Sequence, residues 1–159
     1  MSQRSQMAMT DDEVAAFIEG GRRAHVATID PDGMPHVVPL SYVVIDGRVT
    51  LWTDPASRKV HNLRRDPRVT CLIEEGGHFA EFRAVQMKGR AEVADDPDEV
   101  LSAGLALFAR ARGGNLTDEV KAAVQELVPQ RVAVTIVPEQ VVSWDHRKIP
   151  GLRPGQAGK

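Results

Sequence analysis

The chain has 159 residues, enough for one domain with a real hydrophobic core. Its 42% hydrophobic and 26% charged residues are typical of a globular protein, and its net charge of −2 argues against nucleic acid as a partner. The single cysteine, Cys71, excludes an intrachain disulfide, and no apolar run approaches the ~20 residues of a membrane-spanning helix. We therefore expect a cytoplasmic protein without a membrane span.

The first structured element is expected just after the start of the chain. Residues 1–9 have the composition of a flexible N-terminal tail. A helix should begin at Thr10, since Glu13 completes a capping box with it, and should stop at Gly20 and Gly21. The pattern places one domain over residues 10–148 and a C-terminal tail over residues 149–159.

Three strands joined by tight turns are predicted next. Residues 22–30 alternate as a strand, and the turn that follows leaves Gly33 free to adopt a positive φ. Residues 34–45 form a second strand that is apolar on both faces, which indicates burial between a barrel interior and another surface, such as a partner subunit. Asp46 and Gly47 predict a hairpin turn into the strand over residues 48–53.

The second half of the chain predicts two more strands, two helices and a closing strand. Strands are expected over residues 68–75 and 79–95, the latter long or bent with a bulge at Gly89. Asp96 should cap a helix with an apolar face of Leu101, Leu105 and Phe108, and Thr117 a second helix. Residues 131–148 close the sheet. Because tight turns join the early strands, the fold class is mainly β (α+β), an antiparallel barrel with helical insertions.

Basic charge is concentrated in residues 52–69, where five cations face two carboxylates and leave a local charge of +3. A turn at residues 54–57 predicts a helix from Ser57 to Asp66, with Val60 and Leu63 on its inner side. Cations oppose the helix dipole in a first turn, whereas an anion is favoured there. Three interpretations remain open: a solvated helix face, a phosphate site and a nucleic-acid contact, the last disfavoured by the few aromatic residues nearby.

No pattern in the sequence supplies a metal site or a catalytic constellation. The five histidines lack metal-ligand spacing, and there is no phosphate-binding glycine loop or nucleophile elbow. Cys71 lies in an apolar strand and reads as a packing residue. Trp52 and Trp144 suggest core or interface packing, or contact with a planar ring. A bound cofactor that carries the chemistry would fit this composition.

Three segments, residues 25–44, 51–75 and 85–93, together resemble the pyridoxamine 5′-phosphate oxidase-like split β-barrel superfamily. Within it the chain is similar to the flavin and deazaflavin oxidoreductases that include F420-dependent reductases. The most specific element is the pattern Ser-x-Lys-x-x-Asn-Leu-x-x-x-Pro, which is met by Ser57, Lys59, Asn62, Leu63 and Pro67. The resemblance implies an antiparallel split β-barrel with peripheral helices, and a homodimer with cofactor sites at its interface.

The same resemblance implies hydride transfer between reduced F420 and an unsaturated small molecule. The alternatives are an FMN-binding oxidoreductase and a non-catalytic flavin or F420 carrier. The C-terminus lacks the substrate-binding Arg/His motif of true pyridoxamine phosphate oxidases, so oxidation of vitamin B6 is not expected. The implied cofactor-binding residues are Pro39, Leu40, Ser41, Trp52, Thr53, Ser57, Arg58, Lys59, Asn62 and Gln86, the last from the other subunit. No catalytic residue is implied.

Three further arginines leave the choice of cofactor open. Arg64, Arg65 and Arg68 follow the proposed phosphate seat closely in the sequence. They would offer a basic groove to the polyglutamate tail of F420. Alternatively, they would be solvated, and would then favour neither F420 nor FMN.

Overall fold

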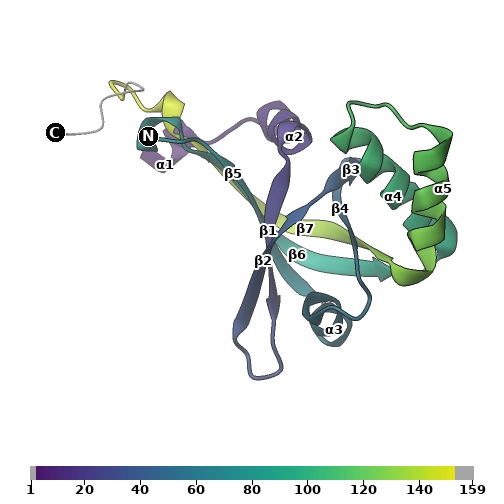
Figure 1. The fold of residues 1–159 in the computed structure, drawn as a ribbon. Helices are drawn as coiled ribbons and strands as arrows, with labels where there is room; N and C mark the ends of the chain where they lie inside the picture. The colour runs from purple at the N-terminus through teal and green to yellow at the C-terminus, as the bar shows by residue number, and fades with distance from the viewer. Residues whose placement is uncertain (1–2, 153–159) are drawn as a thin grey trace.

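The computed structural model describes residues 3–152. Seven antiparallel strands form one curled sheet in the order β2-β1-β5-β6-β7-β4-β3, which confirms the predicted mainly β, split-barrel architecture (Figure 1). The strands are β1 (Arg23–Ile29), β2 (Pro35–Ser41), β3 (Val43–Ile45), β4 (Arg48–Thr53), β5 (Arg68–Glu75), β6 (Arg83–Ala94) and β7 (Val132–Asp145).

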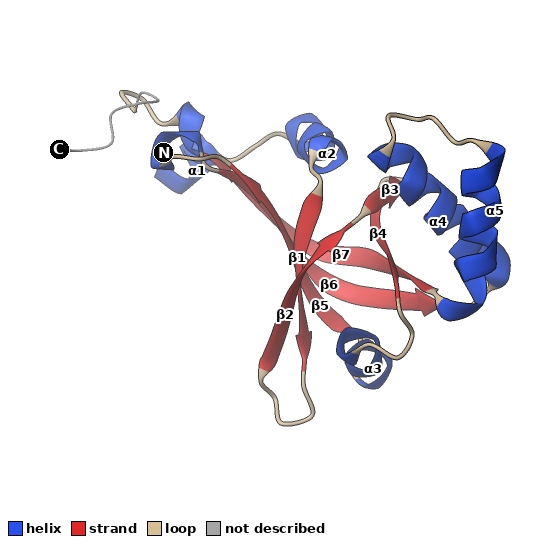
Figure 2. Ribbon diagram, viewed as in Figure 1, coloured by secondary structure: helices blue, strands red, loops and turns tan. Residues whose placement is uncertain are grey.

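The helices lie around the sheet and leave one side of it open (Figure 2). Helices α4 and α5 pack together beside β3 and β4, whereas α3 lies at the end of the barrel that carries the β1–β2 hairpin. The helices are α1 (Gln3–Met7), α2 (Asp11–Gly20), α3 (Arg58–Arg65), α4 (Pro97–Ala111) and α5 (Asp118–Leu127), with short 3-10 turns η1 (Phe79–Glu81), η2 (Val128–Gln130) and η3 (His146–Lys148). None of the described helices has the length and apolar character needed to cross a bilayer.

Buried side chains from α2, α3 and five of the seven strands, together with Tyr42, fill the barrel. Val60 and Leu63 of α3 point into this core as predicted, since both are almost fully buried. Cys71 is also buried there, and its burial raises the pKa of the thiol to about 12, so it is a packing residue and not a nucleophile. A second, smaller core beneath α4 consists of Val100, Ala103, Val128 and Ala133.

The predicted local signals are confirmed at several boundaries. Thr10 and Glu13 form the reciprocal capping box of α2, with the Thr10 amide 2.7 Å from a Glu13 carboxylate oxygen. Asp96 accepts hydrogen bonds from the first-turn amides of α4. Asp46 and Gly47 both have positive φ, as a tight hairpin turn requires. Register shifts at Gly89, where an added Cβ would meet the backbone of Val137.

The structure corrects the predicted second strand. Residues 34–45 divide into β2 and β3 at Tyr42, whose side chain turns into the core and donates a 2.6 Å hydrogen bond to the Ile18 carbonyl. Burial raises the pKa of Tyr42 to about 12. Strand β2 lies at the sheet edge and none of its residues is buried within one chain. Its burial by a partner subunit remains a prediction.

Two smaller expectations are also corrected. Residues 79–81 form η1 and not the start of a long strand. The most deeply buried side of α4 is formed by Val100, Ala103 and Gly104, while the predicted apolar face is only half-buried. Helix α1 lies within the segment expected to be a flexible N-terminal tail. Most of the predicted C-terminal tail, residues 153–159, lies outside the described residues.

Candidate functional site

In the turn that leads from β4 into α3, the serine hydroxyl bonds to the turn and does not cap the helix. Ser57 is the N-cap residue, but its hydroxyl donates to the Asp54 carbonyl at 2.7 Å and makes no cap hydrogen bond. The Asp54 carboxylate accepts from the Ala56 amide, also at 2.7 Å. Within residues 3–152 no acceptor contacts the backbone N–H groups of Arg58 and Lys59. The first turn of α3 therefore has two donors available to an anion.

Lys59 adds a cation to these donors. Its side chain is half-buried, and no hydrogen bond or ion pair holds its amine within the described part of the chain. Burial lowers the pKa of Lys59, an effect that the negative charge of Asp54 partly opposes. A half-buried ammonium without a partner gains from an anion beside it. The sequence pattern alone did not reveal this burial.

Asp30, the residue that directly follows β1, contacts both Arg58 and Asn62 of α3 through its carboxylate. The Arg58 guanidinium lies 3.2 Å from Asp30, and the Asn62 amide donates to the same carboxylate at 2.8 Å. Asn62 is 2% exposed and also donates to the Thr28 hydroxyl at 3.0 Å, so it fastens α3 to β1. Sequence reasoning missed Thr28 and Asp30 because both precede the motif by about thirty residues, and Asp30 carried only a turn signal.

The three remaining arginines of the basic stretch are already engaged. Arg64 forms a 2.6 Å ion pair with Asp95, and Arg68 forms a bidentate pair with Asp66. Arg65 donates to the Ile29 carbonyl and to the Asn62 side chain. The structure thus gives these arginines partners within the chain, although the ion pairs of Arg64 and Arg68 are exposed to solvent. The choice between a basic groove and solvated side chains stays a prediction.

Pro39 on β2 and Gln86 on β6 lie on one face of the sheet. Pro39 is opposite His25 on β1, His25 is opposite Leu72 on β5, and Leu72 is opposite Gln86 on β6. Because directly opposed residues share a face, Pro39 and Gln86 belong to one row across four adjacent strands. The row faces away from the core that holds the intervening Val26 and Met87.

Leu40 and Ser41 complete the predicted set on β2. Leu40 turns inward and packs against the core, whereas Ser41 is exposed at the end of the strand, opposite Arg23. Trp52 is directed toward α4, where it meets Phe108 edge to face at 5.9 Å. Its indole nitrogen is buried without a hydrogen-bond partner in the described chain. Thr53, the next residue of β4, is buried.

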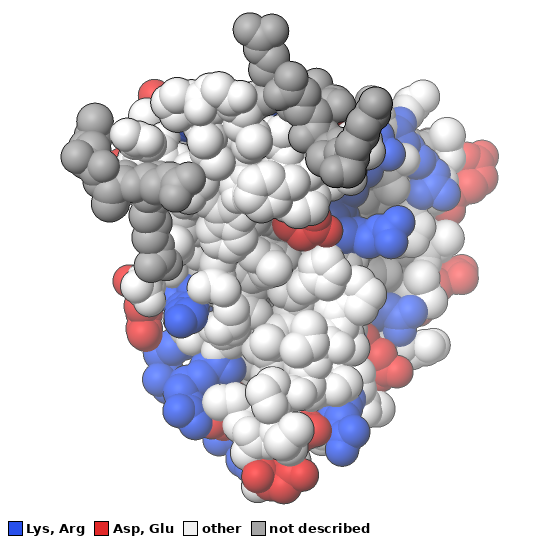
Figure 3. All heavy atoms as spheres, turned by 90° about the vertical axis from the view of Figure 1, so that its left-hand side faces the viewer, with Lys and Arg blue, Asp and Glu red and all other residues white. Residues whose placement is uncertain are grey.

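The open side of the sheet carries few charges. Figure 3 shows the side that lies at the left of Figure 1, where a broad central area consists mostly of uncharged residues with one small acidic patch, and where both basic and acidic side chains lie along the margins. Among the exposed large hydrophobic residues are Met34 in the β1–β2 turn and Val37 on β2, 62% and 56% exposed. A surface of this kind suits contact with another protein surface.

The family is decided by the match of residues 10–145 to the model of pyridoxamine 5′-phosphate oxidase. The chain belongs to the pyridoxamine 5′-phosphate oxidase family. A conserved hypothetical protein from Mycobacterium tuberculosis is 39% identical, with 99% of each chain covered and a TM-score of 0.88.

More distant solved structures share the family fold with different bound groups in their names. A FAD-binding protein from Mesorhizobium loti is 24% identical over 86% of this chain and 94% of its own, with a TM-score of 0.66. An F420 reductase is 20% identical over 79% and 93%, with a TM-score of 0.60. The haem storage protein HutZ from Vibrio cholerae is 18% identical over 84% and 94%, with a TM-score of 0.64. At these identities the likeness concerns the fold alone.

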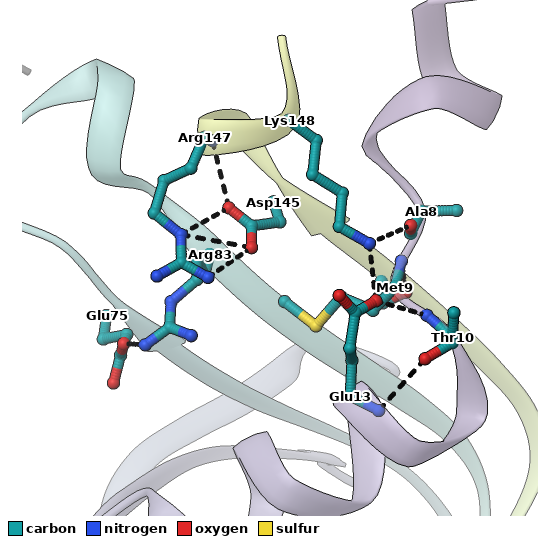
Figure 4. A network of polar contacts seen from close by, with 10 residues as sticks. Ala8, Met9, Thr10, Glu13, Glu75, Arg83, Asp145, Arg147 and Lys148 are labelled. Atoms are coloured by element: carbon teal, nitrogen blue, oxygen red, sulfur yellow. Dashed lines mark hydrogen bonds and ion pairs between the residues drawn. The ribbon is translucent and has the colours of Figure 1, made fainter. Parts of the chain in front are cut away.

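Near the C-terminal end of this family domain, an ion pair between Lys148 and Glu13 joins η3, which directly follows β7, to the start of α2 (Figure 4). Asp145 is buried and forms a bidentate ion pair with Arg147, whose hydrogen bonds lower the pKa of the carboxyl group. Lys148 donates to the Ala8 carbonyl and to Glu13, the residue that caps α2. This end of the closing strand therefore has a structural role. No three His, Cys, Asp or Glu side chains within residues 3–152 are placed to bind a metal.

Proposed function

We propose that this member of the family is an F420-dependent oxidoreductase that transfers hydride between the reduced deazaflavin and an unsaturated small molecule. The observation that carries the proposal is the half-buried, unpartnered amine of Lys59 beside the two available N–H groups at the start of α3. A phosphate bound there would supply the missing negative charge and accept charge-assisted hydrogen bonds. This chemistry fits the phosphate that F420 and FMN share.

The chain's own residues would bind and orient the cofactor, which when bound supplies the hydride chemistry. Ser57, Arg58 and Lys59 would hold its phosphate, and Asn62 would keep α3 in place through β1. The remaining residues predicted to line the cofactor are on the strands: Pro39, Leu40, Ser41, Trp52 and Thr53. The protein would act by positioning the ring and excluding water.

A homodimer is part of the proposal. The row from Pro39 to Gln86 lies on the face of the sheet that is turned away from the core, where a second copy would cover it. Gln86 would then reach the cofactor that is bound mainly by the other subunit. Light scattering of the purified protein gives its mass directly, and a monomer at micromolar concentration would contradict this part of the proposal.

FMN is the second candidate cofactor, and one observation favours it. Arg64 and Arg68 are paired with Asp95 and Asp66, and Arg65 is bonded within the chain, so this stretch offers the acidic tail of F420 no unpaired cation. A cofactor without that tail loses nothing by this arrangement. The two candidates share the phosphate seat and differ in what lies beyond it.

Fluorescence titration of the full-length protein with F420 and with FMN decides between them. Tighter binding of F420 supports the proposal, whereas tight FMN binding with undetectable F420 binding would replace it with the second candidate. Lys59→Ala should weaken either cofactor by about 1.5–3 kcal/mol, the scale of a charge-assisted hydrogen bond. Unchanged affinity would place the phosphate elsewhere.

Turnover separates an enzyme from a carrier. Reduced F420 is mixed with the protein and a panel of quinones, enones and tetrapyrroles, and its reoxidation is followed by absorbance. Acceptor-dependent reoxidation supports the oxidoreductase. Tight cofactor binding without reoxidation by any acceptor would favour the non-catalytic carrier, the alternative from a different functional class.

A further inference from the structure

A pocket of about 660 Å³ lies where the C-terminal ends of α2 and α4 meet the start of β1 and the end of β2. Three arginines line it, namely Arg22, Arg23 and Arg110, and Glu19 is its one carboxylate. Ser41, which is predicted to line the cofactor, also borders the pocket. The balance of charge in the lining therefore favours an anion.

Arg110 is a fixed wall of this pocket. Its guanidinium donates to the carbonyl groups of Glu19, at 2.6 Å, and Gly21, and stacks over the Tyr42 ring at 4.9 Å from the ring centre. These contacts place its charge at the C-terminal end of α2, where the exposed carbonyl groups favour a cation. Arg110 thus has a structural role, and its positive charge also lies at the pocket.

Arg22 and Arg23 are the cations that remain available. Both side chains are exposed, and neither guanidinium group forms a hydrogen bond or ion pair with any residue in the described range 3–152. Arg23 is opposite Ser41 across the β1–β2 ladder, so its side chain shares a face with the Ser41 hydroxyl. A carboxylate or phosphate would find two guanidinium groups and a hydroxyl near one another here.

The other wall of the pocket is apolar. It is formed by Leu107 and Ala111. A simple inorganic anion would leave this wall unused, whereas an anion attached to an apolar body would cover it. The lining therefore matches an organic anion.

A second pocket of about 400 Å³ shares Arg22 and Arg23 with the first and continues to His25 and Pro39. The Nδ1 atom of His25 is buried without a hydrogen-bond partner in the described chain, which leaves it free to bond to a ligand. Glu74 and Glu75 lie at this second pocket and disfavour an anion there, although Glu75 is paired with Arg83. The charges thus orient a ligand with its anionic end in the first pocket.

We propose that the two adjoining pockets bind the substrate, an unsaturated small molecule whose apolar body carries a carboxylate or phosphate group. The anionic group lies between Arg22 and Arg23, the apolar body lies against Leu107 and Ala111, and the uncharged end points toward His25 and Pro39. This inference rests on the proposed function, because Pro39 and Ser41 are the residues predicted to line the cofactor ring.

Three matched probes test the pocket in the full-length protein, with and without cofactor. Cinnamate carries a carboxylate, cinnamamide is its uncharged analogue, and phenyl phosphate carries a phosphate. Binding is measured by calorimetry and by shifts in the amide resonances of residues 22–25 and 41. We expect cinnamate or phenyl phosphate to bind at least tenfold more tightly than cinnamamide, and the better of the two identifies the anionic group. If neither cinnamate nor phenyl phosphate binds more tightly than cinnamamide, the proposal is overturned.

The double variant Arg22→Gln/Arg23→Gln should lose at least tenfold in affinity for the anionic probes, while its affinity for cinnamamide stays unchanged. Arg90→Gln is the matched control, because Arg90 is an exposed arginine on β6 that borders neither pocket. Anion binding retained in the double variant would overturn the proposal. If the double variant loses anion binding but neither F420 nor FMN binds the protein, the pocket stands and the proposed function fails.

Discussion

The amide nitrogen of Asn62 lies 2.8 Å from the carboxylate of Asp30, and through this contact the helix of the candidate phosphate site is fixed to β1. Asp30 also pairs with Arg58 at 3.2 Å, so one carboxylate orients both a buried amide and an exposed guanidinium. The first turn of α3 is thereby held in place by residues that do not themselves face the anion. A site organised in this way is preformed, which lowers the entropy cost of binding.

Asn62→Ala should destabilise the protein by about 2–3 kcal/mol, since the variant removes the buried donor of the Thr28 hydroxyl and one of the two partners of Asp30. Urea unfolding followed by circular dichroism measures the change. Asn115→Ala is the control, because Asn115 is exposed in the loop between α4 and α5 and should change stability by less than about 0.5 kcal/mol. Equal effects of the two substitutions would contradict the role given to Asn62.

Asp30→Asn tests how the carboxylate influences the phosphate site. The new side chain keeps an oxygen that can accept from Asn62 but removes the negative charge beside Arg58. Because Arg58 is exposed, the gain is modest, and we expect cofactor affinity to rise by about 0.5–1 kcal/mol. Titration of F420 and FMN at low and high salt measures it. Weaker binding at unchanged stability would show that Asp30 supports the bound phosphate instead of competing with it.

The fold was predictable where its signals are local. The capping box of Thr10 and Glu13, the turn at Asp46 and Gly47 and the limits of α3 each depend on residues a few positions apart. The break at Tyr42 was not predictable in this way, because it depends on burial and on a hydrogen bond to Ile18, twenty-four positions away.

The candidate site shows the same division. Ser57 to Lys59 could be selected from the sequence because the helix start and the charges are contiguous. The partners that hold or neutralise the basic stretch could not, since Thr28, Asp30 and Asp95 are each about thirty residues from their partners. The prediction of which face of α4 is buried was wrong for a related reason, because Gly104 packs against Trp52 from a distant strand. Contacts across the sheet decide these features.

Lys59→Met should stabilise the cofactor-free protein by about 0.5–1 kcal/mol while it weakens cofactor binding. The lowered pKa of Lys59 means that the folded state binds this proton less tightly than the unfolded chain does. The charged lysine therefore lowers the free energy of unfolding. This cost is fully present below the pKa of Lys59 in the folded state, and it disappears as pH rises through the pKa of the unfolded chain. The stability gain should therefore be constant near neutral pH and shrink at about pH 10–11.

Urea unfolding of both proteins at pH 7 and pH 10.5 measures the Lys59→Met effect. Lys88→Met is the control, since Lys88 is exposed on β6 and has no burial to relieve. A Lys59→Met variant that is less stable than the wild type at pH 7 would mean that the lysine has a structural partner. The assignment of Lys59 to an unfilled anion site would then be wrong.

Gly89→Ala should cost about 2–3 kcal/mol, because a Cβ at this position would meet the Val137 carbonyl and the Glu139 amide across the bulge between β6 and β7. Backbone atoms cannot move aside as a flexible side chain can, so the two longest strands would have to separate locally. Gly20→Ala is the matched control, since Gly20 ends α2 and has open space around its Cβ position. Thermal unfolding of the two variants compares them directly. A Gly89→Ala protein as stable as Gly20→Ala would show that the bulge tolerates a side chain and that its glycine is not required by close approach of the strands.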